Sequence, residues 1–231
     1  MKAQLTLLAG ATLLAAALLP AAARAELPAA CADAPFAEHR AALSARTFTL
    51  PVTEKICYRD TAGAHIIFLT ESGDGPSSEA PLSRRIEAHL FGLDASGALL
   101  AEGTVVDAIA DGEAGVRFWR SVSEVRDIDG DGLAEVILAY RFLNWTYDGK
   151  QPDLDPFAGR AKLIVFHKGS KAAIRATTHD LDPGRETSAS PPYFKLPVSL
   201  QAYLVKKMKR MYEDHLFGFD NSHGFRPVRG K

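Results

Sequence analysis

The chain has 231 residues, of which 24% are charged and 47% are hydrophobic, and its formal net charge is −1. This length fits one domain of moderate size with a hydrophobic core. Nucleic acid is not an expected partner, because phosphate binding normally requires a net basic surface.

The first 25 residues have the pattern of a secretory signal peptide. Lys2 supplies a positive start, an apolar run follows, and the small residues Ala23 and Ala25 stand three and one positions before the expected cleavage site. Cleavage after Ala25 removes Lys2 and Arg24, which leaves 25 basic residues against 28 acidic ones. No later stretch is apolar over the roughly 20 residues that a membrane-spanning helix needs. The sequence therefore predicts a periplasmic or secreted protein without a transmembrane segment.

The chain contains two cysteines, Cys31 and Cys57, and both follow the signal peptide into an oxidising compartment. A disulfide between them is the expected state, and it would stabilise the fold by about 3 kcal/mol on the chain-entropy account. The alternative is a lipid anchor on Cys31, because residues 27–31 loosely resemble a lipobox. Arg24 and Glu26 interrupt the apolar run that such a box needs, and an intact mass would separate the two cases.

Beyond Pro51 the sequence is typical of a mainly β (α+β) domain with an antiparallel sheet of about eight strands. Turn residues bound the extended runs, as in 61–63, 94–97 and 167–170, each of which predicts a hairpin. The lead-in at 26–50 has only weak helical periodicity. The expected strands are 55–59, 65–70, 86–93, 99–109, 118–127, 135–142, 162–166 and 172–178.

The expected domain covers residues 26–220. Besides the strands, it contains two long loops and one helix. The loops are 72–83, rich in Gly, Ser and Pro, and 144–160, rich in Asp, Pro and Gly. Residues 199–216 have the spacing of an amphipathic helix, with Ser199 as its N-cap. Its basic face could contact anionic lipid or polysaccharide, or it could simply be solvated. Residues 221–231 are expected to be a flexible tail.

The acidic segment 127–135 has the spacing of a calcium loop. Calcium takes six to eight oxygen ligands, which requires several carboxylates on a tightly curved backbone. Gly132 allows the sharp turn at the sixth position. The expected ligands are the carboxylates at positions one, three and five, the carbonyl at position seven and the carboxylate at position nine: Asp127, Asp129, Asp131, Leu133 and Glu135.

Two features distinguish this segment from its alternatives. Leu138 stands where an EF-hand has its bidentate Glu, and the strand-like run 136–140 follows, so the sequence does not predict an EF-hand. Asp–Gly pairs also form ordinary hairpin turns without a metal, but alternating carboxylates would repel one another there. Extracellular calcium sites are commonly weak, with dissociation constants of about 10⁻⁴ to 10⁻³ M. We therefore expect a structural ion.

The loop resembles the Asp-x-Asp-Gly-Asp-Gly loops of integrin-type (FG-GAP) repeats, in which the acidic residue at position nine closes the site. Over roughly residues 55–217 the order of motifs is also similar to a family of uncharacterised bacterial exported proteins, some labelled surface-polysaccharide-biosynthesis-like. The residues that carry this resemblance are 127–136, Tyr140, 153–156, 162–164 and 171–175. The resemblance implies a fold more than a function.

No common catalytic motif is present, and no catalytic residue is expected. The acidic residues Asp148, Asp153 and Asp155 could in principle act on a glycosidic bond, and Trp145 and Tyr147 could stack on a sugar ring. Solvated turns and core closure explain the same residues with fewer assumptions.

The sequence thus favours a non-enzymatic exported protein with a binding or accessory role at the cell envelope, ordered by calcium. Its partner would be a surface polysaccharide or an envelope protein. The alternatives are a calcium-dependent polysaccharide-acting enzyme and an inhibitor of an envelope enzyme that presents loop 72–83 or 144–160.

Overall fold

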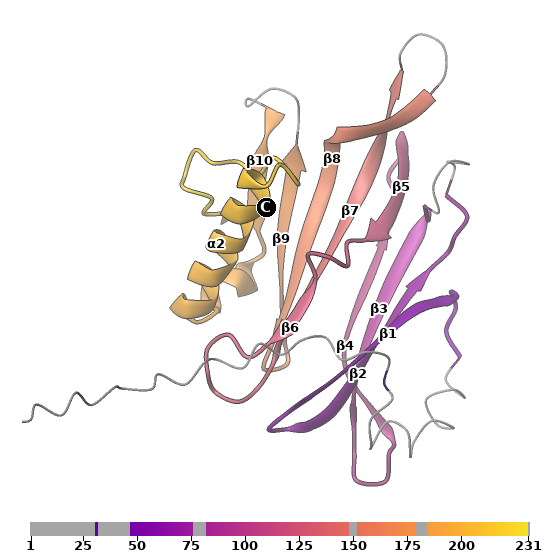
Figure 1. The fold of residues 1–231 in the computed structure, drawn as a ribbon, viewed down its shortest axis with the longest axis vertical. Helices are drawn as coiled ribbons and strands as arrows, with labels where there is room; N and C mark the ends of the chain where they lie inside the picture. The colour runs from indigo at the N-terminus through magenta and orange to yellow at the C-terminus, as the bar shows by residue number, and fades with distance from the viewer. Residues whose placement is uncertain (1–30, 32–46, 76–81, 148–151, 179–183, 231) are drawn as a thin grey trace, which may run out of the picture.

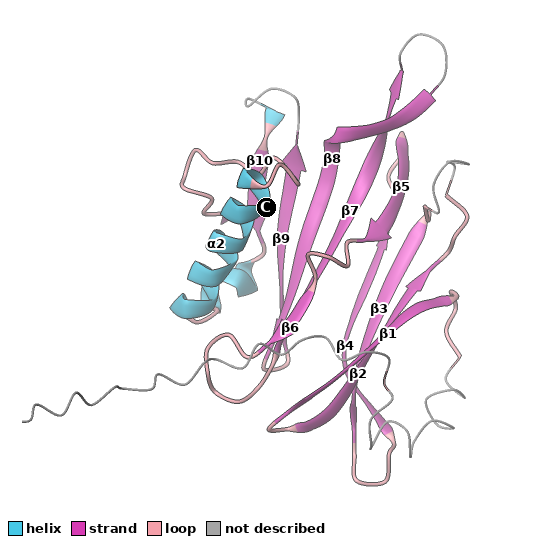
Figure 2. Ribbon diagram, viewed as in Figure 1, coloured by secondary structure: helices cyan, strands magenta, loops and turns pink. Residues whose placement is uncertain are grey.

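The computed structural model describes residue 31 and residues 47–75, 82–147, 152–178 and 184–230. The signal-peptide prediction and most of the lead-in at 26–50 lie outside these residues. The described chain is mainly β, as expected, and it has three layers: a four-stranded sheet, a seven-stranded sheet and a helix (Figures 1 and 2).

The four-stranded sheet is an antiparallel meander in the order β1-β2-β3-β4. Two of the predicted hairpin turns, 61–63 and 94–97, connect β1 to β2 and β3 to β4. Asp94 accepts hydrogen bonds from the backbone N–H groups of Ser96 and Ala98, which explains why Asp suits the second turn. The strands are Val52–Asp60 (β1), Gly63–Glu71 (β2), Arg85–Leu93 (β3) and Leu99–Ala108 (β4).

The seven-stranded sheet has the order β11-β10-β9-β8-β7-β5, with β6 also paired to β7. All of its pairs are antiparallel except β10 with β11. Its strands are Glu113–Phe118 (β5), Glu124–Arg126 (β6), Glu135–Tyr147 (β7), Pro152–His167 (β8), Ser170–Thr178 (β9), Glu186–Ala189 (β10) and Val228–Arg229 (β11).

The core follows from the alternation of side chains along β7, which is apolar on both faces. Val136, Leu138 and Tyr140 point toward the four-stranded sheet, where they pack with β2 and β3 side chains. Ile137 and Ala139 point to the opposite face and pack under the helix. That helix, α2 (Val198–Glu213), covers the sheet with four buried side chains: Leu200, Leu204, Met208 and Met211.

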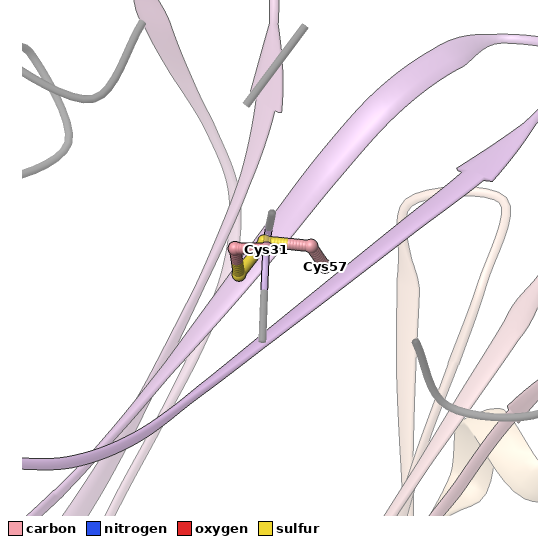
Figure 3. Close-up of a disulfide and its surroundings, with 2 residues drawn as sticks. All are labelled: Cys31 and Cys57. Atoms are coloured by element: carbon pink, nitrogen blue, oxygen red, sulfur yellow. A yellow bond between two sulfur atoms is a disulfide. The ribbon is translucent and has the colours of Figure 1, made fainter. Parts of the chain in front are cut away.

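The predicted disulfide between Cys31 and Cys57 is confirmed (Figure 3). It joins the N-terminal segment to β1 on the outer face of the four-stranded sheet. Phe48 packs on the same face, with its ring centroid 4.9 Å from that of Phe68. The sulfur of Cys31 is thus committed to Cys57, and the same atom cannot also carry a lipid.

Several element predictions need correction. The expected strand 118–127 is wrong: β5 ends at Phe118, a turn follows, and β6 covers only 124–126. The expected loop 144–160 is also wrong in its extent, because β7 continues to Tyr147 and β8 begins at Pro152. β-branched and aromatic residues at 143–147 explain the continuation of β7.

The C-terminal region also differs from expectation. Helix α2 begins at Val198 after Pro197, so Ser199 lies inside the helix and is not its N-cap. The expected tail instead contributes the buried Phe225 to the core and supplies β11. Of the described helices, none is long and apolar enough to cross a membrane.

Candidate metal site

The acidic loop 127–135 joins β6 to β7, and its curvature is fixed by hydrogen bonds to Asp127. The backbone N–H of Gly130 donates to Asp127 Oδ1 at 2.7 Å, and that of Gly132 donates to Oδ2 at 2.9 Å. Both glycines have positive φ, at 80° and 88°. One carboxylate therefore organises both turns of the loop, at the positions where glycine best adopts left-handed backbone.

Three loop carboxylates converge, as the spacing predicts. Asp127, Asp129 and Asp131 each place an oxygen within 4.8 Å of the other two. The side chain of Asp129 is only 10% exposed, and its Oδ1 atom is buried with no hydrogen-bond partner. A buried carboxylate oxygen without a partner is costly, because it loses water and gains nothing in exchange. A positive charge beside this atom would offset that cost.

Glu135 closes the loop from the start of β7, and its side chain is 1% exposed. Its Oε2 accepts a hydrogen bond from the backbone N–H of Ile128 at 2.7 Å, and its Oε1 lies 2.8 Å from Nδ1 of His167. Asp129, Glu135 and His167 also form a second group with ligand atoms within 4.8 Å. The oxygen-only group suits a hard cation such as calcium, whereas the group with His167 suits a transition metal.

A lysine ammonium lies beside the same carboxylates. Lys168 occupies the β8–β9 turn with φ of 48° and forms an ion pair with Asp131. Its Nζ atom is also 3.9 Å from Asp129 Oδ2. The Lys168 hydrogen bond is the main cause that lowers the pKa of Asp131, and the same contact raises the pKa of Lys168. The loop thus attracts an internal cation, although Lys168 leaves Asp129 Oδ1 without a partner.

The outer side of the loop contacts the β1–β2 turn of the other sheet. Thr61 donates two hydrogen bonds to the carbonyl of Gly132, from its backbone N–H at 2.9 Å and from Oγ1 at 2.8 Å. The N–H of Ala134 donates to Asp60 Oδ2 at 3.1 Å. The loop therefore connects the two sheets at one end, and its conformation is coupled to the turn.

Asp60 also holds a buried histidine. The two ring nitrogens of His65 lie 3.0 Å from Asp60 Oδ1 and 3.0 Å from Glu102 Oε2, and Tyr58 stacks on the ring at 4.7 Å. A neutral imidazole has one N–H, so only the protonated ring donates to both carboxylates. Burial alone would lower the pKa of His65, but Glu102 and Asp60 together raise it.

The pKa of Asp60 moves in the opposite direction. Burial alone would raise it, but hydrogen bonds from the backbone N–H groups of Ala134 and Ala62, together with His65, lower it below its usual value. A cavity of about 280 Å³ lies between these groups and the β8–β9 turn. Its walls combine the polar side chains of His65 and Glu102 with the apolar side chains of Leu90, Val136 and Phe166.

The aromatic and acidic residues proposed for ligand contact lie on the β7–β8 hairpin, away from the loop. Trp145 pairs with Leu154, and both pack against a small cluster of Leu82, Ala114 and Leu143. Tyr147 pairs with Pro152, and Asp153 with Thr146. Asp155 Oδ1 accepts a hydrogen bond from Ala158 N–H at 2.8 Å. Asp148 lies outside the described residues.

Sequence reasoning missed the surroundings of the loop. The sequence places His167, Lys168 and Thr61 in expected turns and His65 at the start of an expected strand, and it assigns Asp60 to no element. No local signal identifies them, because their contacts with 127–135 depend on how two sheets pack. The sole pointer is that hairpin turns lie at sheet ends, where loops from different strands can meet.

Changing Gly130 and Gly132 separately to alanine tests the contact between the acidic loop and Thr61 in the β1–β2 turn. Gly130→Ala should lower the free energy of unfolding by about 1–2 kcal/mol, the cost of left-handed backbone, because nothing lies within 4 Å of its added Cβ. Gly132→Ala should cost about 1–3 kcal/mol more, because its Cβ would lie 2.7 Å from Thr61 Cγ2. Urea unfolding measures both. Thr61→Ser removes Cγ2 and should recover part of the additional loss, whereas equal losses for both glycines would contradict the contact.

The pH dependence of the free energy of unfolding should report the protonation of His65. Because its folded pKa lies above the ordinary 6.5, the protonated ring stabilises the fold below that pH, and this contribution is lost as pH rises through the folded pKa. Urea unfolding between pH 6 and pH 9 should therefore show a downward slope that His65→Asn removes. His223→Asn, at an exposed position, is the control and should keep the slope. An unchanged slope in His65→Asn would refute a protonated His65 held between Asp60 and Glu102.

No protein-family model, curated protein or solved structure matches the chain. The case for a metal site at residues 127–135 therefore rests on their own geometry. Three carboxylates converge, a fourth closes the loop, and one buried carboxylate oxygen has no hydrogen-bond partner.

Proposed function

We propose that the protein is an exported calcium-binding protein in which the ion is structural, with a binding or accessory role at the cell envelope. The observation that carries the proposal is the buried Oδ1 atom of Asp129, which lacks a hydrogen-bond partner within a group of converging carboxylates. Export is proposed from the signal-peptide pattern of residues 1–25 and is compatible with the disulfide.

The residues present fit a hard divalent cation. Asp127, Asp129 and Asp131, whose oxygens converge, would hold it through their carboxylates. The carbonyl of Leu133 and the carboxylate of Glu135, which converges with Asp129 and His167, would complete the set at the positions that the loop spacing predicts. The ion would supply the positive charge that the buried oxygen of Asp129 lacks. Leu138, at the twelfth position, is 1% exposed within β7 and contributes to the core, which fits a loop closed at Glu135.

A structural role follows from the position of the loop between the sheets. Residues that would bind the ion alternate with residues that hold the β1–β2 turn: Gly132 accepts from Thr61, and Ala134 donates to Asp60. An ion that fixes the loop would therefore also fix the end of the four-stranded sheet. We propose that calcium stabilises this contact and that chelation weakens it.

Calcium titration with matched variants tests the proposal. At a calcium concentration ten times the dissociation constant, binding should raise the free energy of unfolding by about 1.4 kcal/mol. Asp129→Asn should remove this response and leave the melting temperature in chelator unchanged or higher, because it removes a buried charge. The triple change of Asp127, Asp129 and Asp131 to Asn should also remove the calcium response, but it should lower the melting temperature in chelator, because it weakens the Asp127 hydrogen bonds and removes the Lys168–Asp131 ion pair. No heat of binding and an unchanged melting temperature at millimolar calcium would refute the proposal.

The identity of the ion is tested with His167→Gln, which alters the nitrogen-containing group and leaves the three aspartates intact. Calcium binding should persist in this variant within about threefold, since imidazole is a poor calcium ligand. The same titrations with zinc and magnesium serve as comparisons. Tight zinc binding that His167→Gln abolishes, without a calcium response, would replace the oxygen site by a transition-metal site.

Lys168 should compete with calcium for the same carboxylates. Lys168→Met should strengthen calcium binding about fivefold, because it removes a competing ammonium, and it should lower the melting temperature in chelator, because it removes the ion pair with Asp131. The matched control is Lys171→Met, which removes the same charge from β9, where Nζ donates to the carbonyl of Thr104. Equal effects of the two changes on the dissociation constant would show that Lys168 acts only through net charge.

A further inference from the structure

A second cavity, of about 540 Å³, lies between β6 with its preceding turn and helix α2. None of the residues that line this cavity belongs to the acidic loop 127–135. Arg126, on its wall, directly precedes Asp127 in the chain. Six charged side chains line it: Glu124, Arg126, Lys206, Lys207, Arg210 and Asp214. Four of these are basic and two are acidic, so the wall is net positive in a chain whose net charge is −1.

One of the two acidic residues is already neutralised. Glu124 accepts a hydrogen bond from the Tyr203 hydroxyl at 2.7 Å on one oxygen, and Lys207 lies 2.7 Å from the other. The Lys207 side chain is 14% exposed, so this pair is largely shielded from water. Glu124 and Lys207 therefore serve mainly to fix α2 on β6, and they leave the remaining basic groups in excess.

Those remaining groups are Arg126, Lys206 and Arg210, and none of them forms an ion pair with any residue in the described part of the chain. Lys206 and Arg210 are four residues apart on α2, so they share one helix face, where like charges repel. Arg126 comes from β6 on the opposite wall, with its guanidinium carbon 5.9 Å from the Tyr203 ring centroid. Arg126 is half-buried, and most of the other half-buried basic side chains in the described residues have acidic partners, as in Arg160 with Glu113.

We propose that this cavity binds a small soluble ligand that carries two or more oxyanion groups, such as phosphates, sulfates or carboxylates. A guanidinium or ammonium group binds such oxygens through charge-assisted hydrogen bonds, and Arg can do so with two parallel bonds. The volume falls in the range of small-molecule sites. Because the three groups face a hollow from two elements, a compact multivalent ligand can reach all of them, whereas the planar surface of an anionic membrane would meet only the helix face.

The probe is inositol hexasulfate, measured by calorimetry at low ionic strength in calcium-free buffer, with uncharged inositol and inorganic sulfate as comparisons. The hexasulfate should bind, and the two comparison compounds should bind at least tenfold more weakly. Lys206→Gln combined with Arg210→Gln should weaken hexasulfate binding at least tenfold. Both residues are exposed, so the fold should persist, and circular dichroism checks this.

The control removes the same charge outside the cavity. Lys195→Gln combined with Lys209→Gln changes two exposed basic residues, one of them on α2 itself, and should weaken binding less than twofold. Equal weakening by the two pairs would overturn the site in favour of diffuse electrostatic attraction. Binding to vesicles that contain anionic phospholipid, without binding of the hexasulfate, would overturn it in favour of a membrane surface. No binding of the hexasulfate at millimolar concentration would also overturn it.

Discussion

The burial of β7 on both faces is the constraint from which the architecture follows. Val136 and Ile137 are adjacent in sequence, and they lie in different cores, one between the sheets and one beneath α2. A strand of this kind needs a packing partner on each face, here a second sheet and a helix, because either face left in water would expose a row of large apolar side chains. The close approach of the sheets at Gly103, where an added Cβ would lie 2.5 Å from Phe166 Cε1, shows how tightly the inner face is filled.

The buried carboxylates near the start of β7 are stabilised in the same way. Glu135 is the first residue of the strand, so its carboxylate is buried by the same packing that buries the apolar residues after it. Asp60 is buried at the corresponding end of β1, and each of these carboxylates has a histidine partner and a backbone N–H donor. Buried charges are tolerated when they are paired in this way. The exception is Asp129, whose Oδ1 atom is buried without a hydrogen-bond partner, and this atom is the basis of the cation site that we propose.

The sequence was sufficient for the β-rich class, for α2 and for the three hairpin turns, because side-chain alternation and turn residues are local signals. It also placed Asp127, Asp129 and Asp131 on one curved loop, since their spacing alone brings them together. The sequence did not predict β10 and β11, because these strands are too short to show a side-chain pattern and depend on pairing with neighbouring strands. It failed equally for His65, His167 and Lys168, because their roles arise from contacts between segments separated by tens of residues.

The parallel pairing of β10 with β11 has a consequence for the order in which the chain can fold. Residues 228 and 229 complete one edge of the large sheet, and Phe225 fills the space between α2 and that sheet. A chain that emerges from its N-terminus can form the small sheet and the first hairpins early, but the apolar face of the large sheet stays uncovered until α2 and Phe225 have followed. Until then that face is exposed to solvent, so the second core can close only after the helix and Phe225 have been synthesised.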